Sequence, residues 1–135
     1  MREHSDEAYV IDLCDKVLNR AAKRGHRFEF LIGDKGHKLP VDAFYEDLMI
    51  VVEYRERQHS EAVTHFDKRQ TVSGMSRGQQ RVRYDQRRRE VLPKHEIRLV
   101  EIDYSQFSHT SSKRLKRVPP EDIKVLQKLL RDNAA

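Results

Sequence analysis

Five consecutive apolar residues, Leu48 to Val52, stand in the middle of a chain of 135 residues in which 36% of the residues are charged. An unbroken apolar run of this kind is typical of a β-strand that is covered on both faces. Other elements of the chain must therefore pack on both sides of the sheet that contains this strand. We expect one domain over residues 1–135, since domains of roughly 100–150 residues are the commonest.

The segments around this run predict further helices and strands. Capping by Ser5 and an apolar stripe at helical spacing predict a first helix that stops at Gly25. Proline and acids in a first turn predict a last helix over about 120–132. The other predicted elements are strands over 27–32 and 39–44, a helix over about 80–94 and a strand over 97–102.

This order of helix, three strands, helix, strand and C-terminal helix indicates the α/β (α+β) class. A helix that connects two strands of one sheet makes a crossover, so we expect a mixed four-stranded sheet flanked by helices. The core is expected over about residues 5–103. A long irregular excursion is expected over 54–80, and a polar, basic linker over 108–117.

Positive charge is concentrated in the second half of the chain. Residues 67–117 carry 14 Lys/Arg and 6 Asp/Glu, a net charge of +8, whereas residues 1–66 carry 10 and 13, a net charge of −3. A carboxylate-bearing segment beside a cationic segment suits an enzyme that grips phosphates and holds a divalent metal. A solvated basic face explains the charge equally well.

Several classes of protein are excluded by the composition. No apolar run approaches the ~20 residues of a membrane span, and the first residues lack the apolar stretch of a signal peptide. We therefore expect a soluble, cytoplasmic protein without a membrane partner. Cys14 is the single cysteine, which excludes an internal disulfide and a cysteine-rich zinc site. We expect its thiol to be buried in the first helix.

Two carboxylates occur where neighbouring strands are expected. Asp42 is in the second predicted strand, and Glu53 directly follows the apolar run. A turn centred between residues 46 and 48 places Asp42 across from somewhere in 50–54. A carboxylate at the end of a buried strand needs a partner, and Mg²⁺ takes one or two carboxylates with water and phosphate. Arg55 is the alternative partner of Glu53, in a structural salt bridge.

Asp42, ten intervening residues and then Glu53-Tyr54-Arg55 resemble the signature of the PD-(D/E)XK nuclease superfamily. Residues 53–59, 84–89 and 97–100 are similar to the branch that contains very-short-patch repair endonucleases. The resemblance covers about residues 5–103. It implies a restriction-endonuclease-like core, cleavage of DNA, and a Mg²⁺ or Mn²⁺ ion bound by Asp42 and Glu53.

The resemblance also implies roles for residues outside this pair. Glu7 matches an acidic residue that many members place near the metal, early in the first helix. His59 matches a histidine that this branch carries after the central strand, and would act as a general base or a phosphate contact. A surface position is the alternative for His59. Asp85 would help to orient the active site, although pairing with arginines on its own helix also explains it.

Two departures from the family pattern bear on the chemistry. Val41 separates Pro40 from Asp42, so the literal Pro-Asp pair is absent, and Arg55 stands where the family has lysine. A guanidinium stays protonated at any accessible pH, so Arg55 cannot act as a general base. It is expected to neutralise charge on the phosphate, while the metal or His59 activates water.

The basic residues of the second half are expected to contact nucleic-acid phosphates. Lys113 and Arg114 would add a second contact, or belong to a mobile, solvated linker. The residues of the densest basic cluster are Arg77, Arg81, Arg87, Arg88 and Arg89.

Together these features predict a metal-dependent DNA endonuclease that serves repair, restriction or homing. One alternative is a non-catalytic nucleic-acid-binding protein with a degenerate nuclease site, and another is an interaction domain whose charges are purely solvating. The sequence leaves open RNA in place of DNA and the specificity of cutting. It is also compatible with a homodimer, in which paired sites would cut both strands.

Overall fold

The computed structural model describes residues 5–56 and 77–132. The order of elements predicted from the sequence is confirmed, and the fold is mixed α/β. The helices and strands are α1 (Asp6–Leu18), β1 (Lys23–Ile32), β2 (Lys38–Tyr45), β3 (Ile50–Arg55), α3 (Arg77–Lys94), β4 (Arg98–Asp103) and α4 (Pro119–Asp132). Single-turn 3₁₀ helices are η1 (Asp34–Gly36), η2 (Glu46–Leu48) and η3 (Tyr104–Gln106).

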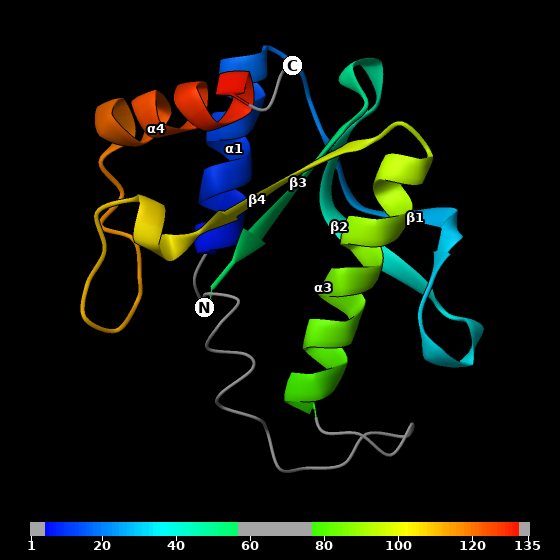
Figure 1. The fold of residues 1–135 in the computed structure, drawn as a ribbon. Coiled ribbons are helices and arrows are strands. Elements are labelled where there is room, and N and C mark those ends of the chain that lie inside the picture. The colour runs from blue at the N-terminus through cyan, green and yellow to red at the C-terminus, as the bar shows by residue number, and fades with distance from the viewer. Residues whose placement is uncertain (1–4, 57–76, 133–135) are drawn as a thin grey trace.

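The four strands form one mixed sheet in the order β1-β2-β3-β4 (Figure 1). β1 and β2 are antiparallel, as are β2 and β3, whereas β3 and β4 are parallel. Helices α1 and α4 lie on one side of the sheet, and α3 lies on the other (Figure 1). This arrangement explains the unbroken apolar run, because β3 is an inner strand with helices over both of its faces.

Successive residues of β3 contribute to two separate cores. Ile50 and Val52 belong to a large cluster with the apolar sides of α1 and α4. Val51 belongs to a smaller cluster with Leu92 of α3. Both clusters follow from the alternation of side chains along a strand.

Helix α1 begins as predicted and ends earlier than predicted. The side chain of Ser5 accepts a hydrogen bond from the backbone N–H of Ala8 at 3.0 Å. The helix ends at Leu18 and not near Gly25, because Asn19 adopts the left-handed conformation and its N–H bonds back to the last turn. Asparagine tolerates this conformation almost as glycine does. Gly25 lies inside β1, which therefore begins at Lys23.

The beginning of β3 differs from the prediction, whereas the burial of Cys14 agrees with it. Leu48 is in η2 and not in a strand, because Met49 turns the chain in the left-handed conformation before β3 begins. Cys14 is buried, as expected. Of the excursion predicted over 54–80, residues 57–76 lie outside the described residues. The prediction is wrong at both ends, because Tyr54 and Arg55 belong to β3 and residues 77–80 belong to α3. In the part of the chain that the structure describes, no helix combines the length and the apolar character needed to cross a bilayer.

Candidate functional site

Asp42 and Glu53 lie side by side on neighbouring strands, as the turn length predicted. Ala43 of β2 pairs with Val52 of β3, so the next position along places Asp42 beside Glu53. The backbone N–H of Asp42 donates to Oε2 of Glu53 at 2.6 Å, and the N–H of Tyr54 donates to Oδ2 of Asp42 at 2.8 Å. Each carboxylate is therefore held by the backbone of the other strand.

Glu7, in the first turn of α1, is the third carboxyl group of this site. Its carboxyl group lies close enough to that of Asp42 for each acid to affect the pKa of the other. Burial raises the pKa of Glu7, and the nearby charge of Glu53 raises it further. The structure thus brings together three acids that the sequence singled out, from α1, β2 and β3.

The acids of this site also raise one another's pKa. Burial raises the pKa of Asp42 to about 6, and the charge of Glu7 adds to this, against the lowering effect of the N–H of Tyr54. Burial raises the pKa of Glu53, and the charge of Asp42 raises it further. Three carboxyl groups with raised pKa values form a place that favours an added positive charge.

Arg55 supplies part of that positive charge. Its Nη1 lies 2.8 Å from Oε1 of Glu53, so the salt bridge considered as an alternative is present. Its Nη2 lies 3.1 Å from both Oδ1 of Asp85 and Oε1 of Glu101. Burial opposes the charged form of Arg55, but these three carboxylates outweigh burial and raise its pKa above the ordinary value.

Arg88, predicted as a nucleic-acid contact, makes its contacts within the protein. It is buried, and its Nε and Nη2 donate to the carbonyl of Pro40 at 3.2 and 2.8 Å. Its Nη1 lies 3.2 Å from Oδ1 of Asp85, and its Nε lies 3.7 Å from Oε1 of Glu53. Arg88 therefore faces the carboxylates from inside the molecule, and little of its surface is left for the predicted contact with nucleic acid.

The other arginines of α3 divide between internal contacts and solvent. Arg89 makes two hydrogen bonds to Glu101, both at 2.7 Å. Arg87 donates to the carbonyl of Ile32 at 2.7 Å. Arg77 and Arg81, near the beginning of the helix, are exposed. Only part of the predicted basic cluster thus faces outward.

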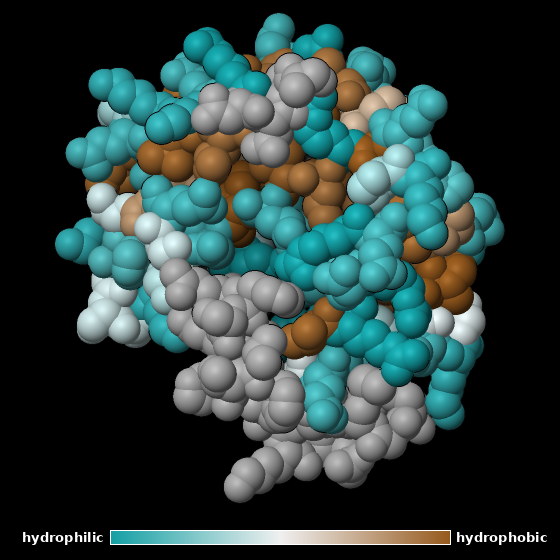
Figure 2. Space-filling model, in the orientation of Figure 1, coloured by the Kyte–Doolittle hydropathy of each residue, from teal (hydrophilic) through white to brown (hydrophobic). Residues whose placement is uncertain are grey.

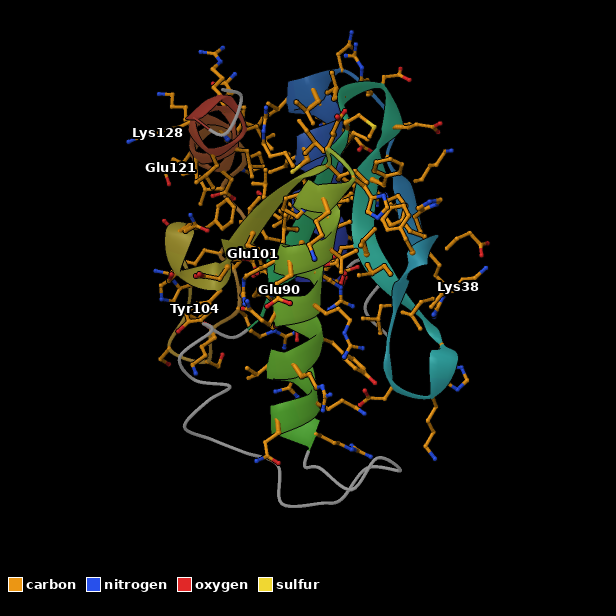
Figure 3. The ribbon with its side chains drawn as sticks, turned by 45° about the vertical axis from the view of Figure 1, so that its right-hand side comes forward. Lys38, Glu90, Glu101, Tyr104, Glu121 and Lys128 are labelled. Atoms are coloured by element: carbon orange, nitrogen blue, oxygen red, sulfur yellow. The ribbon has the colours of Figure 1, made fainter. Side chains whose placement is uncertain are left out.

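Glu101 is a site residue that the sequence analysis missed. It lies opposite Glu53 in the parallel pairing of β3 with β4, and it binds Arg55 and Arg89. Figure 3 shows it on β4, beside α3. The available signal was its position, because an acid between Val100 and Ile102 interrupts an apolar strand much as Glu53 does.

Lys113 and Arg114 are exposed on a loop that contacts α1. His109 and Leu115 form an isolated β-bridge across the loop, and Leu115 is buried. Oδ2 of Asp6 accepts the backbone N–H of Leu115 at 3.0 Å. The segment that was predicted as a linker is therefore attached to the first turn of α1.

Within residues 5–56 and 77–132, no group of three or more His, Cys, Asp and Glu side chains is arranged to hold a metal ion. Asp42 and Glu53 instead offer two carboxylates, a number with which Mg²⁺ commonly binds when water and phosphate complete its coordination. His59 lies outside the described residues. Comparison of the chain with protein-family models, curated proteins and solved structures gave no match.

Proposed function

We propose that this chain is a divalent-cation-dependent endonuclease that hydrolyses phosphodiester bonds in DNA. The metal ligands in this proposal are Asp42 and Glu53, and Glu7 assists them. We further propose that the mixed sheet and its helices are a restriction-endonuclease-like core of the PD-(D/E)XK kind. The protein would act in the cytoplasm, as a monomer or a homodimer.

The observation that carries the proposal is the convergence of Asp42 and Glu53 on neighbouring strands, where each carboxylate accepts a backbone N–H of the other strand. Burial raises the pKa of Asp42 to about 6, and the charge of Glu7 adds to this, so the site disfavours further negative charge. A hard divalent cation would offset that charge, because its ligands are deprotonated carboxylate oxygens.

The residues present fit a Mg²⁺ or Mn²⁺ ion by their chemistry. All three acids offer hard oxygen atoms, and two of them are held by backbone N–H groups. Such an ion would supply charge neutralisation at the phosphate and a water of lowered pKa. Oε1 of Glu53 is shared with Arg55, so Arg55 and the ion would divide the charge of this carboxylate.

The role of Arg55 would be to hold the phosphate and stabilise the charge that develops on it. Two carboxylates, Asp85 and Glu101, hold its Nη2. Its Nε is buried and has no hydrogen-bond partner among the described residues. A guanidinium fixed in this way would stabilise negative charge on a bound phosphate through its own positive charge.

Contacts to the DNA backbone would come from two sides of the site. Arg77 and Arg81 are exposed near the beginning of α3, and Lys113 and Arg114 are exposed on the loop before α4. In Figure 1, both regions lie toward the end of the molecule at which β3 ends. Phosphate contacts of this kind make binding fall steeply as salt is added.

The decisive experiment is a plasmid-nicking assay with Mg²⁺ or Mn²⁺. We expect the wild-type protein to nick supercoiled DNA only when the metal is present. Asp42→Asn should reduce the rate by about 100-fold or more, because it removes the charge of one metal ligand. Asp47→Asn is the matched control, since Asp47 is exposed in η2 and outside the site; it should cleave at the wild-type rate.

The second candidate is a non-catalytic DNA-binding protein with an inert acidic site. The observation that favours it is the pairing of Glu53 with two guanidinium groups, those of Arg55 and Arg88. This candidate predicts salt-sensitive binding of DNA without metal-dependent cleavage. Binding that is equal in wild type and Asp42→Asn, with no cleavage by either, would decide in its favour.

A further inference from the structure

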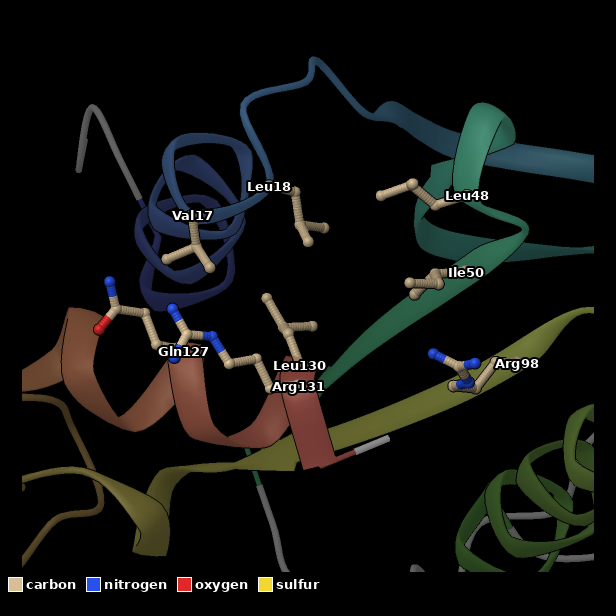
Figure 4. A pocket seen from close by; sticks show the side chains of 8 residues that line it. All are labelled: Val17, Leu18, Leu48, Ile50, Arg98, Gln127, Leu130 and Arg131. Carbon is tan, nitrogen blue, oxygen red and sulfur yellow. The ribbon is translucent and has the colours of Figure 1, made fainter. Parts of the chain in front are cut away.

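A hollow lies away from the carboxylate site, at the other end of β3. It has a volume of ≈ 320 Å³ and is bounded by the last turns of α1 and α4, by η2 and by the beginning of β3 and β4 (Figure 4). Its apolar lining residues are Val17, Leu18, Leu48, Ile50 and Leu130. None of the residues of the carboxylate site lines this cleft, so it is a separate feature.

The apolar floor of the cleft consists of residues of the main core and of residues packed against that core. Ile50 and Leu130 are buried members of that core, whereas Leu18 and Leu48 are only partly buried. In Figure 4, the side chains of Leu18, Leu48 and Leu130 project toward one common space. Figure 2 shows hydrophobic surface uncovered on the upper part of this face. Ligand pockets commonly begin at about 300 Å³, so the cleft suits a small ligand.

The polar residues of the lining give the cleft a positive rim. They are Arg98, Gln127 and Arg131. In Figure 4, the ends of the Arg131 and Gln127 side chains lie close together on the α4 side, and Arg98 lies on the opposite side. The described residues that line the cleft include no acid. The charge complement of this rim is an anionic group, which a guanidinium binds well.

We propose that this cleft binds a small amphiphile that has an apolar chain and an anionic head, such as a medium-chain carboxylate. The chain lies on the floor formed by Leu18, Leu48, Ile50 and Leu130. The carboxylate is held by Arg131 together with Gln127. This site does not depend on the nuclease proposal.

A second copy of the chain is a poorer occupant of the cleft. Two copies that met through this face around a two-fold axis would each present the same cationic rim to the other. Like charges opposed across an interface disfavour association. The small volume of the cleft also suits a single aliphatic chain better than a folded partner.

The test is a titration of the full chain with octanoate, octanol and octylammonium, followed by amide NMR spectra and calorimetry. We expect octanoate to bind most tightly and octylammonium least tightly, with shifts centred on Val17, Leu18 and Leu130. Equal binding of octanol and octanoate would overturn the role of the rim. Absence of octanoate binding would overturn the site, even if vesicles of anionic lipid bound the protein.

Single variants test the apolar floor and the charged rim of the cleft separately. We expect Arg131→Gln to weaken octanoate binding by about 5-fold, as for one solvent-screened ion pair. Lys124→Gln, an exposed change on the same helix, should leave it unchanged. Val17→Trp should abolish binding by filling the cleft, with dispersed NMR signals as the check on folding. If Val17→Trp still bound octanoate, the proposal would be wrong. It would also be wrong if the only effect of the variant were the loss of a concentration-dependent dimer.

Discussion

Ile50, Val52 and Tyr54 point from one face of β3 into the apolar cluster with α1 and α4, whereas Glu53 and Arg55 point from the other face into a set of charges. Burial of apolar side chains is worth about 1.5–3 kcal/mol for each large residue. Buried ion pairs often contribute little net stability compared with an apolar replacement. The first face of β3 therefore contributes mainly to stability, whereas function is expected at the charged end of the second face, beyond Val51 and its apolar cluster.

On the charged face, acidic side chains and arginines from the sheet and from α3 contact one another in alternation. Glu53 meets Arg55 and Arg88, and Asp85 meets the same two arginines. Glu101 joins Arg55 to Arg89. Because acids and arginines alternate, removal of one arginine leaves the acids that it contacts with one countercharge fewer. The two faces should therefore respond differently to substitution.

The largest loss of stability is expected for Arg88→Met. The change leaves Asp85 and Glu53, both buried, with one countercharge fewer. Breaking a buried ion pair in this way costs about 3–5 kcal/mol, measured as the free energy of unfolding in urea. Arg83→Met, at an exposed position of the same helix, should change it by less than about 0.5 kcal/mol.

A double variant sharpens this prediction. Glu53→Gln combined with Arg88→Met removes one charge of each sign, so it should be less destabilised than the sum of the two single variants. Strict additivity would mean that the two side chains do not interact, despite the 3.7 Å between Nε of Arg88 and Oε1 of Glu53.

On the apolar face, we expect Leu126→Ala to lower the free energy of unfolding by about 3 kcal/mol. Leu126 has an exposed fraction of 0% and packs between α4 and the sheet, so its removal leaves a cavity. Leu129→Ala is the control, because Leu129 is only partly buried and should lose less. In contrast to changes on the charged face, Leu126→Ala should leave the affinity for DNA unchanged at temperatures where the protein is folded.

The sequence predicted the apolar face and the order of elements well, because both depend on local pattern. Local sequence pattern allows one interpretation of each of three features: the apolar run that forms β3, the cap at Ser5 and the apolar stripe on α4. The end of α1 was missed because Gly25 is the stronger stop signal in general, whereas Asn19 ends the helix here. The residues after Asn19 lead into β1, which begins at Lys23, so the helix could not continue to Gly25.

The charged face was predicted only in part. The adjacency of Asp42 and Glu53 follows from turn length, which is local. The direction in which each arginine of α3 points depends on how the helix packs against the sheet, so Arg88 and its neighbour Arg87 looked alike in the sequence. Glu101 was missed because its partners, Arg55 and Arg89, come from β3 and α3.

Asp42→Asn is expected to have the smallest effect on the free energy of unfolding among these variants, and it is the only one expected to raise it. The pKa of Asp42 is about 6 in the folded protein, above its ordinary 3.8. The folded state therefore binds this proton more tightly than the unfolded chain, and Asp42 lowers stability progressively as the pH rises from about 4 to about 6. Asparagine keeps an oxygen to accept the N–H of Tyr54 and removes the charge.

We expect Asp42→Asn to be more stable than wild type by about 1–2 kcal/mol at pH ~7.5, after allowance for partial exposure, and equal to it at pH ~3. Unfolding in urea at the two pH values measures both differences, with Asp47→Asn as the control. A variant that is less stable at both pH values would mean that the carboxylate is retained for stability. Added Mn²⁺ should stabilise wild type and not Asp42→Asn, because the repulsion that the variant relieves is the one that a cation would relieve.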